Sequence, residues 1–185
     1  MTDVMIDIET LGGAPRAMIM SIGAVKFEIE ALEPYDTFYT NVTLDGQMRE
    51  IHADTVRWWL QQSGAARESL FVGLELGLKE SLYELAGFVK GADRVWANGT
   101  TFDLVILSDA YKQLSIPVPW SYSQEMCLRP IRFFGEVLGL SYSSFKADYL
   151  GTLHNALDDA RLQTIYLLSV LRAVRPGESV GLANG

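Results

Sequence analysis

Hydrophobic and polar positions in the first forty residues follow the two-residue period of β-strands. Residues 4–8 form an apolar run that contains one acid, Asp7, and residues 19–27 form a second apolar run. Residues 34–40 alternate between polar and apolar side chains, and a Gly- and Pro-containing turn over 12–15 separates the first two runs. This pattern predicts three strands in an antiparallel meander.

Helical spacing dominates the rest of the chain. It predicts helices over residues 55–62, 78–89, 102–114, from about 130, and 157–171, and short strands over 94–97 and 124–128. A meander followed by alternating helices and strands predicts an α/β fold with a mixed central sheet of about five strands flanked by helices. We expect residues 1–175 to form a single domain and the Gly-containing residues 176–185 to form a flexible C-terminal tail.

Composition excludes several classes of protein. Hydrophobic residues make up 49% of the 185 residues, which is too many for a disordered chain. The apolar run at residues 104–107 is far too short to span a bilayer, so no membrane association is expected. No basic residue precedes Arg16, so no signal peptide is expected. The single cysteine, Cys127, cannot form an internal disulfide, and we expect a buried thiol in a cytoplasmic protein.

The net charge of −8 argues against a broad nucleic-acid-binding surface, because proteins that bind nucleic acid through many phosphate contacts are usually basic. It leaves room for a small site in which metal ions neutralise the protein's own carboxylates.

Asp7 and Glu9 are two residues apart in the first predicted strand, so their side chains point to the same face. Burying two like charges together is costly unless a cation separates them. Hard oxygen ligands of this kind suit Mg²⁺ or Mn²⁺. An acid at the strand end that pairs with an arginine is the alternative.

Asp103 follows a predicted strand and the loop 98–101, and is expected at the start of a helix. The Asn98-Gly99 pair suits an unusual backbone conformation that could direct this carboxylate toward the end of the sheet. The alternative is an acid that only complements the helix dipole.

His154 is followed at four and five positions by Asp158 and Asp159. On a helical wheel Asp158 groups with Arg161, on a solvated face, whereas Asp159 lies on a less charged side. We therefore favour Asp159 as the inward-facing acid.

Three segments, in this order, resemble the exonuclease motifs of the DEDDh family of 3′→5′ exonucleases. The first runs from Asp7 to Thr10, the second joins Asn98 to residues 102–103, and the third is His154-x-Ala156-x-x-Asp159. Residues 21–25 are similar to the family's second strand. Residues 55–62 are similar to a subgroup, the exonuclease VIII-like and RNase AS-like proteins of phages and bacteria.

The resemblance implies an RNase H-like fold that holds two divalent cations, Mg²⁺ or Mn²⁺. It implies four metal ligands and a general base that takes the proton of the attacking water: Asp7, Glu9, Asp103 and Asp159 as ligands, with His154 as the base. The implied reaction removes nucleoside 5′-monophosphates from the 3′ end of single-stranded DNA or RNA. The resemblance also suggests a homodimer.

Substrate contacts are expected at Thr10, Leu11 and Asn98, again from the resemblance. Two adjacent tryptophans on a helix, Trp58 and Trp59, cannot both face the core. The exposed one could cover a loop, form a dimer contact or stack on a base. The resemblance favours base stacking by Trp58.

Three alternatives stay open at this point. A catalytically silent RNase H-like module could bind a partner or a nucleic-acid 3′ end, although all five site residues are present. A related enzyme could cut internally. The choice between DNA and RNA as substrate also stays open, because no motif reports contacts to the 2′-hydroxyl.

Three further residues have no assigned role in the reaction. Arg129 and Arg132 could meet phosphates or line a solvated helix face, and His52 is expected to cap or line the following helix.

Overall fold

The computed structural model describes residues 1–175, and the predicted antiparallel meander opens its sheet. β1 (Thr2–Thr10), β2 (Ile19–Glu28) and β3 (Glu33–Val42) pair consecutively. β5 (Arg94–Ala97) pairs parallel to β1, and β6 (Glu125–Cys127) pairs parallel to β5. β4 (Glu75–Leu76) adds a sixth strand beside β3, giving the order β4-β3-β2-β1-β5-β6. Two residues are too few to produce a strand pattern, which explains why about five strands were predicted.

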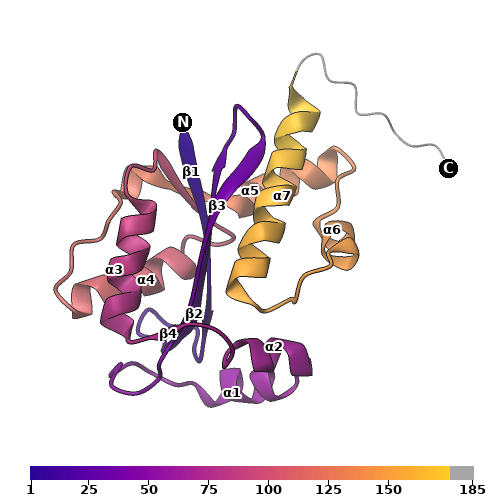
Figure 1. The fold of residues 1–185 in the computed structure, drawn as a ribbon. Coiled ribbons are helices and arrows are strands. Elements are labelled where there is room, and N and C mark those ends of the chain that lie inside the picture. The colour runs from indigo at the N-terminus through magenta and orange to yellow at the C-terminus, as the bar shows by residue number, and fades with distance from the viewer. Residues whose placement is uncertain (176–185) are drawn as a thin grey trace.

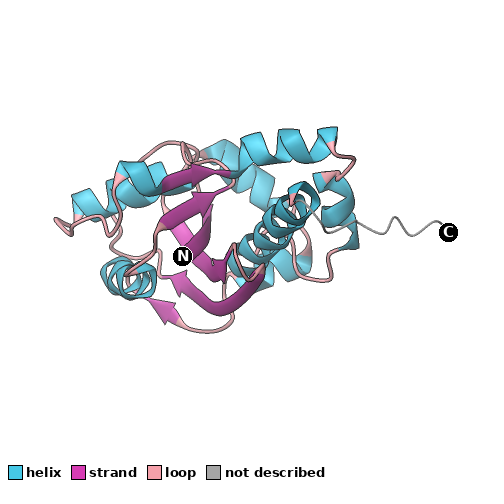
Figure 2. Ribbon diagram, turned by 90° about the horizontal axis from the view of Figure 1, so that it is seen from above, coloured by secondary structure: helices cyan, strands magenta, loops and turns pink. Residues whose placement is uncertain are grey.

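Helices cover both faces of this sheet, which confirms the predicted α/β architecture. They are α1 (Ala53–Leu60), α2 (Gly64–Ser69), α3 (Leu78–Val89), α4 (Asp103–Gln113), α5 (Leu128–Val137), α6 (Tyr142–Asp148) and α7 (Ala156–Val174), with a 3₁₀ turn at Tyr122–Gln124. α3 and α4 lie on one side of the sheet, α5 to α7 lie on the other, and α1 and α2 lie across one end (Figures 1 and 2).

Some details differ from the sequence-based expectation. α2 and α6 were not predicted, because both are short and rich in small or polar residues. Cys127 is half-buried rather than buried, since it ends the edge strand β6. Among residues 1–175 no helix is both long enough and apolar enough to cross a bilayer. The expected tail, residues 176–185, lies outside the described residues.

Alternation along β1 separates its apolar side chains into two cores. Val4, Ile6 and Ile8 pack in the core shared with α3 and α4, whereas Met5 packs in the core shared with α5 to α7. Asp7 and Glu9 continue the row of Met5, because side chains two residues apart share a face. Both acids therefore project toward the side of α7.

The site opens where β5 ends. β5 pairs with β1 only from Asp3 to Met5, and it ends at Ala97, whereas β1 continues to Thr10. The second half of β1 thus runs beyond its parallel neighbour, and the chain after Ala97 turns away from it. Crevices outside the carboxyl ends of parallel strands are the usual binding sites of α/β sheets.

Gly23 allows the start of α7 to approach the sheet closely. It is the partner of Asp7 in the β1–β2 register. A Cβ atom at this position would collide with backbone atoms of Ala156 and Leu157, the first residues of α7. Backbone cannot move aside as a flexible side chain can, so the position requires glycine.

We therefore expect Gly23→Ala to lower the free energy of unfolding by about 1–3 kcal/mol, because the added methyl group overpacks this contact. Urea denaturation measures the change. Gly87→Ala in the last turn of α3 is the matched control: nothing lies within 4 Å of its added Cβ. We expect that variant to gain about 0.5–1 kcal/mol, because alanine favours helix. A Gly23→Ala protein as stable as the wild type would contradict the close approach.

Candidate functional site

A cleft of about 510 Å³ opens at the carboxyl ends of β1 and β5. It brings together all five residues singled out from the sequence: Asp7, Glu9, Asp103, His154 and Asp159. They come from three segments far apart in the chain. The start of α1 and the loop after β5 complete the walls.

The two acids of β1 are held differently. Asp7 Oδ1 accepts a hydrogen bond of 2.7 Å from Nε2 of Gln163, a buried side chain on α7. Glu9 is 8% exposed and accepts no hydrogen bond from another side chain among the described residues. Gln163 therefore fixes the orientation of the Asp7 carboxylate.

Asp103 is the first residue of α4 and is 4% exposed. The carbonyl of Gly99 accepts hydrogen bonds from the backbone N–H groups of Phe102 and Asp103, which turns the loop into the helix. The Asp103 carboxylate accepts the backbone N–H of Ile8 at 3.3 Å. This N–H lies beyond the end of the short β1–β5 ladder, so the side chain of Asp103 satisfies it.

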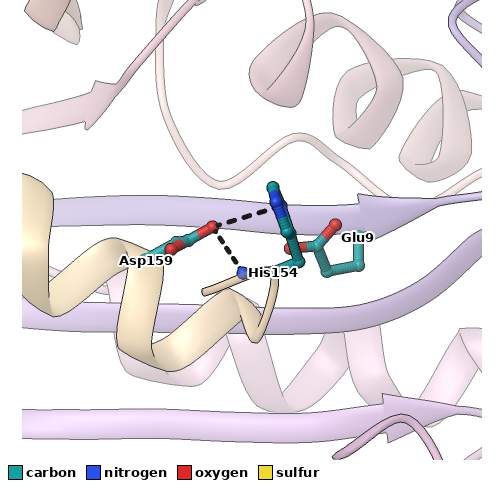
Figure 3. Close-up of side chains that lie close together, drawn as sticks. All are labelled: Glu9, His154 and Asp159. Atoms are coloured by element: carbon teal, nitrogen blue, oxygen red, sulfur yellow. Dashed lines mark hydrogen bonds and ion pairs between the residues drawn. The ribbon is translucent and has the colours of Figure 1, made fainter. Parts of the chain in front are cut away.

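His154 lies in the loop before α7, with a positive φ of 65°. The next residue, Asn155, caps the helix by accepting the backbone N–H groups of Leu157 and Asp158. Asp159 Oδ2 accepts the backbone N–H of His154 at 3.2 Å and lies 4.0 Å from its Nδ1 (Figure 3). Ligand atoms of Glu9, His154 and Asp159 all lie within 4.8 Å of one another.

Asp158 does not line the cleft. It accepts the backbone N–H of Thr152 at 2.9 Å and a hydrogen bond from Arg161 at 3.2 Å, so it holds the preceding loop. The structure brings Asp159 to the cleft, as the helical wheel suggested.

The pKa values of all four acids are raised. Burial is the largest cause for all four. It raises the pKa of Asp103 to about 7 and that of Asp159 to about 6. The pKa values of Asp7 and Glu9 lie well above the usual range, and repulsion from the neighbouring carboxylates adds to the effect of burial.

Within residues 1–175 no lysine or arginine forms an ion pair with any of the four, although the charges of Arg129 and Lys146 lower the pKa values of Asp103 and Asp159 slightly against the effect of burial. Four carboxylates that converge in one cleft, two of them buried and two half-buried, are the donor set that hard divalent cations prefer. The residues therefore fit a metal site.

The pKa of His154 is lowered, whereas the pKa values of the four acids are raised. Burial lowers its pKa, and the positive charge of Lys146 lowers it further. Neutral imidazole therefore predominates at neutral pH, and this form can accept a proton.

The two tryptophans of α1 face in different directions, as predicted. Trp59 is 5% exposed, and its Nε1 donates a 2.9 Å hydrogen bond to the carbonyl of Thr10. Trp58 is 40% exposed, lines the cleft and meets the His154 ring edge-on, with 4.8 Å between ring centroids. This contact with His154 was not predicted.

Two of the three residues predicted to contact the substrate from the family resemblance line the cleft, and the third does not. Thr10 and Asn98 line the cleft, but Leu11 does not. Leu11 packs with Trp59 in a small core, and its backbone N–H and carbonyl bond to Met18 and His52. Its main chain is therefore already engaged within the protein. His52 is the N-cap residue of α1, although its side chain forms no capping hydrogen bond.

Gln163 and Lys146 were given no role from the sequence, and Arg129 and Arg132 were left between phosphate contacts and a solvated helix face. The sequence does indicate that Gln163 lies near the site, because it is one helical turn after Asp159 and on the same side of the helical wheel. Arg129 and Arg132 of α5 both bind Asn98, at its carbonyl and its side-chain oxygen respectively. Nothing in the sequence indicates that Lys146 lies near the site, because only the packing of α6 brings it there.

The mixed sheet with helices on both faces has the RNase H-like fold of DEDDh-family nucleases. The chain belongs to the 3′-5′ exoribonuclease Rv2179c-like domain family, whose model matches residues 2–171. The sequence-based interpretation is thus confirmed at the level of the class, while the narrower subgroup stays a prediction.

A curated relative is an exodeoxyribonuclease of Enterobacteria phage T4, 24% identical over 135 residues, which cover 62% of this chain and 57% of the phage protein. The match thus spans little more than half of that protein.

Solved structures share the fold at low identity. The nuclease domain of 3′hExo, a DEDDh family member bound to rAMP, is 14% identical with a TM-score of 0.64, covering 92% of this chain and 91% of that one. The zinc-bound E. coli exonuclease I complex with single-stranded DNA is 14% identical with a TM-score of 0.69, covering 95% of this chain and 41% of that one.

The raised carboxyl pKa values predict how stability changes with pH. Folding raises these pKa values above those of the unfolded chain, near 4, so the metal-free protein should lose stability as pH rises from about 4 to above 7. Mg²⁺ or Mn²⁺ should restore it at pH 8, by about 2.7 kcal/mol at a concentration 100 times Kd, and much less at pH 5. Thermal unfolding in EDTA and in metal measures both effects.

The double variant Asp7→Asn, Asp103→Asn should flatten the pH dependence and reduce the stabilisation by metal. Equal stabilisation by metal at pH 5 and pH 8 would contradict a site built from these carboxylates.

Proposed function

We propose that this protein is a metal-dependent exonuclease that removes nucleoside 5′-monophosphates from the 3′ end of single-stranded nucleic acid. The observation that carries the proposal is the meeting of four buried or half-buried carboxylates and a neutral histidine in one open cleft, without an ion pair to lysine or arginine in residues 1–175. Such a cluster is costly for folding and is explained by a chemical role.

Two divalent cations, Mg²⁺ or Mn²⁺, would be held by Asp7, Glu9, Asp103 and Asp159. When bound, such ions lower the pKa of a water and stabilise the charge on the attacking and leaving oxygens. Gln163 and the backbone N–H groups of Ile8 and His154 orient three of the four carboxylates. The protein thereby fixes the directions of its ligand oxygens in advance.

His154 acts as the general base that takes the proton of the attacking water. Its lowered pKa keeps it neutral at neutral pH, and the cleft exposes its ring beside Asp159 and Glu9. The positive φ of its backbone places the ring in the cleft immediately before α7 begins.

The wider part of the cleft receives the terminal nucleoside. Thr10, Trp58 and Asn98 line it, and the partly exposed Trp58 offers a surface on which a base can stack. The family match, described as an exoribonuclease, favours RNA over DNA as the substrate.

Dimerisation and a cytoplasmic location stay predictions. Exposed apolar side chains on α5, among them Phe133, Phe134 and Val137, are compatible with a homodimer.

The central test uses 5′-labelled RNA and DNA oligomers, each with a free or a blocked 3′ end, in Mg²⁺, Mn²⁺ or EDTA. Stepwise shortening from a free 3′ end is expected, and EDTA should abolish it. Asp7→Asn should lower kcat/KM at least about 100-fold, because it removes a ligand charge. His154→Ala should lower kcat by about 10²–10⁴-fold, the usual contribution of a general base.

The matched control is Asp45→Asn, which changes an exposed aspartate in the loop after β3 and should retain full activity. Oligomers that bind but stay intact under every metal would favour the catalytically silent module. Products cut internally would favour an endonuclease of the same fold.

Trp58→Ala should raise KM for short oligomers about tenfold or more, because it removes a stacking surface. Trp58→Phe should recover most of the affinity, and Tyr83→Ala, at an exposed aromatic position on α3, should have no effect. Steady-state kinetics separates two roles for this residue. A fall in kcat with unchanged KM would mean that Trp58 positions His154 and does not bind the base.

A further inference from the structure

A second cavity of about 310 Å³ lies beside the carboxylates and shares four residues with the first cleft: Asp7, Asn98, His154 and Asp159. We call it the second lobe. Its own residues come from α5, α6 and α7: Arg132, Tyr142, Ser143, Lys146, Leu162 and Gln163. The shared residues form the boundary between the two spaces, so a chain bound at the carboxylates can extend into both.

The second lobe brings two positive charges, Arg132 and Lys146, close to the four acids, in addition to Arg129, which lines the first cleft. The guanidinium of Arg132 stacks over the Tyr142 ring at 4.1 Å, and its Nη1 donates to Asn98 Oδ1 at 3.2 Å. One side-chain hydrogen bond leaves most of the five guanidinium donors of Arg132 available. Neither Arg132 nor Lys146 forms an ion pair within residues 1–175.

These cations do not neutralise the carboxylates directly, since both stand outside ion-pair distance of all four. Cations placed this way, in a polar space open to solvent, suit an anionic ligand with several acceptor oxygens. A phosphodiester has this chemistry.

The direction in which the strand must leave the carboxylates identifies the phosphate that the second lobe would bind. Under the function proposed above, on which this inference rests, the first cleft holds the 3′-terminal nucleoside and the carboxylates hold the scissile phosphate. The rest of the strand must leave on the other side. We infer that Arg132 and Lys146 bind the phosphate immediately 5′ of the cleaved bond, in the second lobe.

Substrates that differ by this one phosphate test the inference. A dinucleoside monophosphate has only the scissile phosphate, whereas a trinucleoside diphosphate adds the phosphate in question. The ratio of kcat/KM for the longer over the shorter substrate should be at least about tenfold in the wild type, as expected for a charge-assisted contact. A 5′-phosphorylated dinucleotide should show the same gain.

Lys146→Gln and Arg132→Gln should each reduce this ratio severalfold, and Arg132→Lys should recover part of it. Lys79→Gln, which removes an exposed positive charge on α3 across the sheet, should leave the ratio unchanged. Replacing only the upstream linkage of the trinucleotide with a neutral methylphosphonate should lower kcat/KM in the wild type. It should have much less effect in Lys146→Gln, because the partner charge is already absent.

A methylphosphonate penalty of equal size in the wild type and in both variants would overturn the inference. A wild-type enzyme that cleaves the two substrates equally well would also overturn it, while leaving the proposed function intact. A protein that cleaves neither substrate in Mg²⁺ or Mn²⁺ would instead refute the proposed function, and this inference with it.

Discussion

The gathering of four acids, two buried and two half-buried, around the end of one strand is the constraint on which the rest of the structure depends. Asp7 and Glu9 belong to the part of β1 that is paired only with β2, and repulsion cannot push them apart without breaking that ladder. Each desolvated carboxylate costs several kcal/mol when no cation balances it. The two cores that flank β1 must offset that cost, and the acids occupy the edge where the sheet opens to solvent.

The geometry of the site is set by backbone contacts more than by side-chain packing. Gly23 lets the first turn of α7 lie against β2, next to Asp7 in the sheet register. Asn155 caps that turn and also donates to the hydroxyl of Tyr39 on β3. The start of α7, and with it Asp159, is thereby fixed to the same sheet that carries the other acids. Gln163 adds a further link, although its Oε1 has no partner among the described residues.

The sequence predicted those parts of the site whose chemistry contradicts their surroundings. An acid within an apolar strand, such as Asp7, is conspicuous because hydrophobic runs rarely tolerate one. Asp159 could be separated from Asp158 by helix periodicity alone. Arg132 could be named as a possible phosphate contact but not separated from a solvated helix face. Lys146 could not be recognised, because exposed cations on helices are ordinary, and only the tertiary packing of α5 and α6 brings both to the site. Similarly, β4 gains its strand character from β3 and has too few residues to show a period of its own.

Net charge and local charge have opposite consequences in this protein. With a net charge of −8, the protein as a whole repels a polyanion, so long-range attraction cannot bring substrate to the cleft. Cations near the carboxylates act only within a few ångströms, since salt screens charges beyond about 8–10 Å. Under the proposed function, recognition would therefore depend on the last few nucleotides, held by short contacts on both sides of the carboxylates. An acidic protein can in this way bind the end of a strand while having little affinity for its length.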